Sequence, residues 1–520
     1  MEKELRILKS AGTIGLVTAL SRVLGYVRDA ALAWVLGASL SMDAFAVAYR
    51  LANLFRRLVA EGAMSAAFVP VFVQYREEHT QEELWEFARK FFYMLALVTG
   101  AIVLLEIISA PFIVRLMAPG FFKVEGKWEL TVLLTRLMAP YLIFIALTAF
   151  LMGILNSFGY FAVPALGPVF FNLAVIGAAF SFGHWTQEPA LGIAFGVLLG
   201  GVLQFVSQLP LAVKQGMRFQ FGFSFYHPAI RKVSILLAPS IFGVGIVQIN
   251  LLVDSLMASL LREGSVSQIY YADRVMELAL GIFVVSLTTV TLPEMAQSAA
   301  RKDIEELKRT MLFTLRTISF IAIPATVGLF LLADPIVHVL FERGRFSSVD
   351  TERTAVALAY YALGLSFISA VKFLVSAFYA LQDTKTPVKI AFAALITNAI
   401  LNWILMHPLK QGGIALATSL ASALSFFLLL FTFQKRYGSF DWQKFRESLI
   451  KIAIASAAMG VLSLVALRIF QLDVNQPLRW KVIGLFGSIG FGILVYLGFT
   501  VLLKMEELSL FKKFRLRSAE

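Results

Sequence analysis

Long apolar runs separated by short polar segments recur along the whole 520-residue chain. Each run approaches the roughly 20 residues that an α-helix needs to cross the hydrocarbon core of a bilayer. The runs lie near 12–37, 42–73, 91–117, 130–156, 160–183, 190–213, 232–261, 269–296, 311–333, 355–381, 387–406, 412–434, 448–470 and 481–503. The pattern therefore predicts an all-α polytopic membrane protein with about fourteen transmembrane helices.

Lysine and arginine gather in alternate segments between these runs, including 76–90, 214–232, 301–309 and 435–451, and at both ends of the chain. The opposite segments GASLSMD and GHWTQEP contain neither residue. Because loops rich in Lys and Arg remain in the cytoplasm, this asymmetry predicts that both termini are cytoplasmic.

The chain also contains an internal repeat. Three matches occur in order: Phe150-Leu151 before Pro164 with Phe373-Leu374 before Pro387, Gly192-Ile193-Ala194 with Gly413-Ile414-Ala415, and Ala48-Tyr49-Arg50-Leu51 with Ala272-Asp273-Arg274-Val275. All three share an offset of roughly 221–224 residues, which is typical of transporters built from two homologous halves. We predict two six-helix lobes, 1–220 and 221–437, and a segment 438–520 that adds two C-terminal helices and a cytoplasmic tail.

Charged residues interrupt the apolar pattern at corresponding helices of the two halves. The first two spans carry Arg22, Arg28, Asp29, Asp43, Arg50, Arg56, Arg57 and Glu61, and the eighth span carries Tyr270, Asp273, Arg274 and Glu277 on one helical face. Charge inside a bilayer is costly, so it faces a bundle interior or a water-filled cavity. The residues form either ion pairs that lock helices together or a basic cavity that holds an anion, and the surplus of arginine favours the cavity.

Composition excludes several classes of function. Hydrophobic residues make up 59% of the chain and charged residues only 15%, against about 25% charged in soluble domains. The net charge of +13 lies in loops, where it signals topology rather than nucleic-acid binding. The chain has no cysteine, no Walker A sequence and no HExxH motif. An integral membrane glycosyltransferase or ligase would need a large catalytic loop, so we expect a transporter that requires no cofactor.

Four motifs point to a family. The segments SRVLGYVRDA, SMDAFAVAYRLANLFRRLVAEGAMSAAFVPVF, SVSQIYYADRVMEL and LQDTKTPVK closely resemble the MurJ/MviN family of lipid II flippases, which belongs to the multidrug/oligosaccharidyl-lipid/polysaccharide exporter superfamily. The resemblance implies movement of lipid II, undecaprenyl-diphosphate-MurNAc-pentapeptide-GlcNAc, from the inner to the outer leaflet of the bacterial cytoplasmic membrane by alternating access. It also implies a role in cell-wall synthesis, with membrane lipids and cell-wall synthesis proteins as further partners.

The resemblance assigns roles to charged residues. The family's cavity arginines match Arg22, Arg28 and Arg274, its acidic residue at the start of the second span matches Asp43, and its arginine pair matches Arg56 and Arg57. Asp273, beside Arg274, completes the expected substrate-binding set. A guanidinium presents a fork of donors that suits diphosphate oxygens. The last two helices are implied to form a groove for the polyprenyl tail.

A candidate sodium site lies in the second half. Asp254 stands in the middle of an apolar span, where a carboxylate needs a partner or a cation. Asn398 and Asn402 share a helical face, and Thr418 follows on the next span. These oxygen ligands suit a hard cation, and some family members have a sodium site on the matching helices. The alternative is that the two asparagines only form hydrogen bonds between helices.

Two other functions remain open from the sequence. One is a cation-coupled drug exporter, or another polysaccharide-lipid exporter, of the same superfamily. Cationic drugs call for an acidic cavity, and the three cavity arginines disfavour them. The other is a non-transporting scaffold for the cell-wall machinery, which a flipping assay with purified protein in vesicles would distinguish from a flippase.

Overall fold

The computed structural model describes residues 2–57, 64–182, 188–219, 227–469 and 477–507, and within these ranges it contains helices and no strand. The chain forms two compact units, Met1–Ser267 with Arg343–Phe346 (unit 1) and Gln268–Glu342 with Ser347–Glu520 (unit 2).

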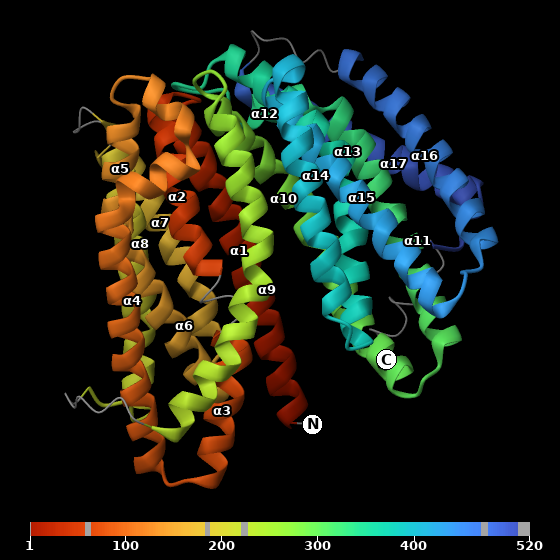
Figure 1. Cartoon of the computed structure of the whole chain (residues 1–520). Coiled ribbons are helices and arrows are strands. Elements are labelled where there is room, and N and C mark those ends of the chain that lie inside the picture. The colour runs from red at the N-terminus through yellow and green to blue at the C-terminus, as the bar shows by residue number, and fades with distance from the viewer. Residues whose placement is uncertain (1, 58–63, 183–187, 220–226, 470–476, 508–520) are drawn as a thin grey trace. The chain divides into compact units, whose positions relative to one another are not determined.

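The helices of Figure 1 are α1 (Glu2–Leu36), α2 (Leu40–Arg56), α3 (Met64–Glu78), α4 (Gln81–Met117), the 3₁₀ helix η2 (Pro119–Lys123), α5 (Lys127–Met138), α6 (Tyr141–Ser157), α7 (Ala162–Phe182), α8 (Pro189–Lys214), α9 (Pro228–Ser259), α10 (Ser265–Ala300), α11 (Ile304–Leu331), α12 (Ala333–Phe341), α13 (Ser348–Ala380), α14 (Lys385–Leu409), α15 (Gln411–Tyr437), α16 (Trp442–Ile469) and α17 (Leu478–Leu502). The all-helical prediction is confirmed.

Ten segments of the described chain are long and apolar enough to cross a membrane, with α5 and α6 counted as one. The ranges of the other four predicted spans hold α1, α2 with the first part of α3, α9 and α10. The count of fourteen therefore stays a prediction. The fourth predicted span is not one straight helix, because α5 ends at Met138 and α6 begins at Tyr141. Pro140 lies between them and has no N–H group to donate to the preceding turn.

Small residues allow the helices of unit 1 to pack closely. A Cβ atom added at Gly196 of α8 would lie 2.4 Å from the Cβ of Ala178 in α7. One added at Gly201 would lie 2.7 Å from the Tyr141 ring of α6. Small residues at such contacts let membrane helices approach and gain van der Waals packing. The sequence GVLLGGV of α8 is therefore a helix-packing segment.

Aromatic side chains fill the interior between α3, α4 and α6. Phe68 of α3 has its ring centroid 5.0 Å from that of Phe91 in α4 and 5.0 Å from that of Phe150 in α6. All three side chains are fully buried. Such ring pairs add about 0.5–1.5 kcal/mol each beyond their buried area. This aromatic cluster packs α3 against α4 and α6.

Corresponding residues of the predicted repeat occupy equivalent positions in their own units. Phe150 lies seven residues before the end of α6 and Phe373 lies seven residues before the end of α13, and both side chains are 0% exposed. Pro164 is the third residue of α7 and Pro387 is the third residue of α14, where a missing N–H group costs little. The two-lobe architecture follows from these matches. Helix α9 packs against α3 and α4 and belongs to unit 1. The bounds 1–220, 221–437 and 438–520 come from the sequence repeat and stay a prediction.

The two helices outside the repeat, α16 and α17, pack against α11 in unit 2. The Tyr496 hydroxyl of α17 donates a hydrogen bond to the carbonyl oxygen of Phe320 in α11 at 2.7 Å. Beyond α17, the Glu507 carboxylate lies 2.7 Å from the Arg316 guanidinium of α11 and accepts from Ser448 of α16 at 2.6 Å. These contacts attach the additional pair to the repeat core of unit 2.

Candidate functional site

Arg28 is half-buried where α1 packs against α7 of unit 1. Its Nε and Nη2 atoms donate to Oδ1 of Asp29 at 3.0 and 2.7 Å, and its Nη1 donates to Oδ1 of Asn172 at 3.2 Å. The Asn172 amide donates in turn to the carbonyl oxygen of Ser21 at 3.0 Å. Two helices therefore hold the guanidinium in one orientation. Helical spacing places Asp29 on the same face as Arg22. In the structure Asp29 pairs with Arg28 instead, because the long arginine side chain reaches around the helix.

Arg22 is exposed and makes no hydrogen bond or ion pair with any residue that the structure describes. It lies six residues before Arg28, about 9 Å along the helix axis. Helix α1 continues without a break through Gly25, which lies between the two arginines. Unit 1 therefore presents one oriented arginine and, about two turns away, one arginine that is available to an anion.

The stripe predicted along the second span divides into groups with different partners. Nη1 of Arg50 donates to the carbonyl oxygen of Leu251 at 3.3 Å and to the hydroxyl of Ser255, which attaches α2 to α9. Nε of Arg56 donates to Oδ1 of Asn53 one turn earlier at 2.7 Å. Arg57 caps the carboxyl end of α2 and is half-buried. Glu61 lies outside the described residues.

Asp43 is fully buried and has protein donors on both carboxylate oxygens. Its Oδ2 accepts from Lys127 Nζ at 2.7 Å and from the Gly264 N–H at 2.8 Å. Its Oδ1 accepts from the Ser267 N–H at 2.8 Å and from the Ser267 hydroxyl. Lys127 also lies 4.2 Å from the centroid of the Phe121 ring. Asp43 thus joins α2, α5 and the connection between α9 and α10, and its role in binding substrate stays a prediction.

Sequence reasoning missed the partners of these charges. Lys127 opens α5 beside Trp128 and Glu129 and looks like an ordinary loop lysine, so nothing in the sequence pairs it with Asp43. Asn172 could have been found, because a lone amide in the apolar segment PVFFNLAVIG needs a hydrogen-bond partner in a membrane.

Arg274 is the charged centre of the matching helix in unit 2. Its Nη1 donates to Glu277 Oε2 one turn later at 2.6 Å, and its guanidinium lies 5.0 Å from the centroid of the Tyr270 ring. Both contacts are within α10, so the shared face predicted from the spacing is present. Asp273 is half-buried next to it. Arg274 and Asp273 lie in unit 2, whereas Arg22 and Arg28 lie in unit 1.

The residues of the predicted sodium site also divide between the units. Asp254 is 2% exposed and lies in α9 of unit 1. In unit 2 the Asn402 amide donates to Asn398 Oδ1 at 2.9 Å, and the Asn398 amide donates to Thr418 Oγ1 at 3.1 Å. The Thr418 hydroxyl donates to the carbonyl oxygen of Ile414 at 3.2 Å. The three residues thus form a connected polar chain between α14 and α15, and the complete four-residue site stays a prediction.

Comparisons with known proteins identify the family of the chain. The sequence model of the family described as "Lipid II flippase MurJ" matches residues 32–482. The chain belongs to the MurJ family of lipid II flippases. A probable lipid II flippase MurJ of Vibrio cholerae is 35% identical over 511 residues, which cover 96% of each chain. The lipid II flippase MurJ of Burkholderia cenocepacia is 34% identical over 94% of this chain and 96% of its own.

Solved structures extend the comparison to the fold. A MurJ lipid II flippase in an inward closed conformation superposes with a TM-score of 0.78, at 30% identity, and covers 94% of this chain and 98% of its own. An inward-facing multidrug MATE transporter of the MOP superfamily gives a TM-score of 0.69 at 14% identity over 80% of this chain and 94% of its own, a likeness of fold alone. The chain is a multi-span membrane transporter of the MurJ family and not an enzyme.

Proposed function

We propose that this MurJ-family protein moves lipid II from the inner to the outer leaflet of the bacterial cytoplasmic membrane by alternating access, for cell-wall synthesis. Family membership over nearly the whole chain supports the substrate class. The observation that carries the site is Arg22: a cation within an apolar segment, exposed and without a partner among the described residues. A cation in such a place calls for an anion, and the diphosphate of lipid II supplies one.

The three arginines differ in how they are prepared for a diphosphate. Arg22 is available to an anion, whereas Arg28 and Arg274 each hold one carboxylate, from Asp29 and Glu277. A guanidinium has five donors in a planar fork, so a phosphate oxygen can share each arginine with its carboxylate, and on Arg28 it can take the place of the Asn172 oxygen. Hydrogen bonds to charged groups contribute about 1.5–3 kcal/mol each. The carboxylates balance the arginines when the diphosphate is absent.

The same proposal includes orientation and coupling. Both termini lie in the cytoplasm, as the loop charges predict. Asp254, Asn398, Asn402 and Thr418 bind a sodium ion, because one carboxylate, amide oxygens and a hydroxyl are ligands that a hard cation prefers. Cell-wall synthesis proteins are partners by virtue of the substrate.

Complementation tests the assignment. Cells depleted of their own flippase are supplied with this chain or with Arg22→Ala, Arg28→Ala or Arg274→Ala, and colony formation is measured with membrane levels of each variant. We expect the parent to restore growth and each alanine variant to fail at normal membrane levels. Arginine-to-lysine variants restore growth only partly, because lysine keeps the charge and loses the fork.

Arg136→Ala is the matched control, since the exposed Arg136 donates, among the described residues, only to the carbonyl oxygen of Ile107 at 3.1 Å. It should support full growth. Growth restored by the parent and by all three alanine variants would reject the arginine site. A parent that fails to restore growth at normal membrane levels would reject the flippase assignment.

A further inference from the structure

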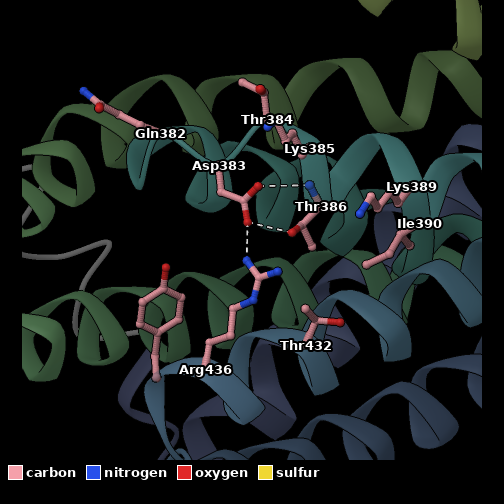
Figure 2. Close-up of a pocket in the computed structure, with 10 residues that line it drawn as sticks. Gln382, Asp383, Thr384, Lys385, Thr386, Lys389, Ile390, Thr432 and Arg436 are labelled. Atoms are coloured by element: carbon pink, nitrogen blue, oxygen red, sulfur yellow. Dashed lines mark hydrogen bonds and ion pairs between the residues drawn. The ribbon is translucent and has the colours of Figure 1, made fainter.

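A pocket of about 640 Å³ opens at the turn between α13 and α14 of unit 2, entirely within that unit. Its volume is within the range of about 300–1,000 Å³ that is usual for ligand sites. Asp383 and Thr386 of the turn face Arg436 and Thr432 of α15 across it (Figure 2). The side chains that line the pocket include three cations, Lys385, Lys389 and Arg436, and one anion, Asp383.

Asp383 already has a full set of donors. Its Oδ1 accepts from the Thr386 N–H at 3.0 Å, and its Oδ2 accepts from the Thr386 hydroxyl at 2.6 Å and from Nη1 of Arg436 (Figure 2). Burial alone would raise the pKa of Asp383, but the hydrogen bonds from Thr386 and the Arg436 guanidinium hold that pKa below its ordinary value. Asp383 is therefore ionised, and it orients Arg436 through one nitrogen and leaves the other edge of the guanidinium toward the pocket.

The two lysines have no such balance. Lys385 and Lys389 are exposed and form no hydrogen bond or ion pair within the described part of the chain. They are four residues apart on α14, where two like charges face each other and destabilise the helix unless an anion lies between them. Lys385 is also the first residue of α14, so the positive end of the helix dipole adds to the same field. The two lysines and the oriented arginine thus give the pocket a net positive charge.

We propose that this pocket binds a phosphate group, either in the headgroup of an anionic phospholipid or free in solution. The loop charges predict that this end of unit 2 is cytoplasmic, and basic pockets between helices on the cytoplasmic side of membranes suit such headgroups. Lys385 and Lys389 supply the charge, and the free edge of Arg436 supplies directed donors to phosphate oxygens. The site is separate from the arginines assigned to the diphosphate of lipid II and does not depend on that assignment.

Binding to the full-length protein in a neutral detergent tests the proposal. The probes are short-chain phosphatidylglycerol, short-chain phosphatidylcholine and inorganic phosphate at matched ionic strength, each titrated while the dissociation constant is measured by calorimetry. The test variant is Lys385→Gln with Lys389→Gln. The matched control is Lys435→Gln with Lys444→Gln, which removes the same charge from exposed lysines of unit 2 that do not line the pocket.

Each basic side chain near an anionic lipid is worth about 5-fold in affinity, so the test pair should weaken binding about 30-fold and the control pair less than about 3-fold. A second variant, Asp383→Asn, should act in the opposite direction. It removes the only anion among the lining residues and releases Arg436, so phosphate should bind more tightly, while the asparagine oxygen can still accept from the Thr386 N–H.

The probes separate the two sources. Loss of phosphatidylglycerol binding in the test pair with no measurable phosphate binding in the parent assigns a lipid headgroup, whereas equal loss for both probes assigns a site for soluble phosphate. Equal weakening in the test and control pairs would show diffuse surface charge and overturn the pocket. Weaker binding in Asp383→Asn, measured in protein with unchanged melting temperature, would also contradict it.

Discussion

Replacement of Asp43 and of Lys127 separates a structural role of this buried pair from a role in binding substrate. The side chains are 1% and 3% exposed, and Lys127 Nζ lies 2.7 Å from Oδ2 of Asp43. We consider Asp43→Asn, Lys127→Met and the double variant. Each single variant leaves one charge buried without its partner, and the double variant removes both charges.

The two single variants should differ in cost because the remaining partners differ. In Asp43→Asn the buried Lys127 ammonium loses its carboxylate and keeps the Phe121 ring at 4.2 Å and a neutral amide oxygen, so the loss approaches the about 3–5 kcal/mol typical for a broken buried pair. In Lys127→Met the carboxylate keeps the N–H groups of Gly264 and Ser267 and the Ser267 hydroxyl. These retained bonds stabilise the carboxylate that has lost Lys127, so the loss should be smaller, roughly 2–3 kcal/mol.

Equilibrium unfolding of the purified variants in mixed micelles measures these free energies. The double variant should lose about 1–3 kcal/mol less stability than the sum of the two single losses, since the second substitution removes the charge that the first one left alone. Glu129→Gln, an exposed change on the same first turn of α5, is the control and should cost less than about 1 kcal/mol. Additive losses, or an Asp43→Asn variant as stable as the parent, would refute the structural role.

Three further predictions follow from other parts of the chain. Single cysteines can be placed in this cysteine-free sequence. A cysteine at Lys410 should react with an impermeant thiol reagent from outside, and one at Glu82 or Glu305 only after permeabilisation. Reaction of Glu82→Cys in intact cells would contradict the predicted orientation. Sodium should raise the melting temperature relative to a large organic cation at equal ionic strength, and Asp254→Ala should abolish that rise; an unchanged rise would remove Asp254 from the site. Burial, with the charge of Lys90 adding to it, lowers the pKa of His227, whose Nδ1 accepts from the N–H of residue 229. The unfolded chain then binds more protons than the folded one, so His227 costs no stability above its ordinary pKa of about 6.5 and destabilises as the pH falls below that value. His227→Asn should show a smaller fall in melting temperature between pH 7.5 and 5.5, and an equal fall in both proteins would contradict the assignment.

The helices could be predicted from the sequence because a bilayer imposes one strong rule, that each apolar run must satisfy its own backbone hydrogen bonds. The equivalence of Phe150 and Phe373 could be predicted from the internal repeat, because matching residues of two homologous halves are buried to the same extent. The division of the fourth span at Pro140 was not visible, because proline is often tolerated within membrane helices. Hydropathy indicates whether a segment is apolar enough to cross a membrane, but it does not indicate whether the segment forms one continuous helix.

The candidate site was predictable only in part. Arg22, Arg28 and Arg274 stand out because charge in an apolar run is expensive. Their partners do not stand out, because a contact such as Asp43 with Lys127 joins residues 84 positions apart. Helical spacing reports only neighbours on the same helix. It therefore placed Arg274 and Glu277 on one face and could not identify the bond from Arg28 to Asn172.

Transfer of lipid II by the purified protein in sealed vesicles tests the central claim most directly. Lipid II is placed in one leaflet, and its appearance in the other is followed with a reagent that cannot cross the membrane. The account predicts transfer by the parent well above that of protein-free vesicles, loss of transfer in Arg22→Ala, Arg28→Ala and Arg274→Ala, and full transfer in Arg136→Ala. Transfer by the parent that equals protein-free vesicles, or that persists in all three alanine variants, would contradict it.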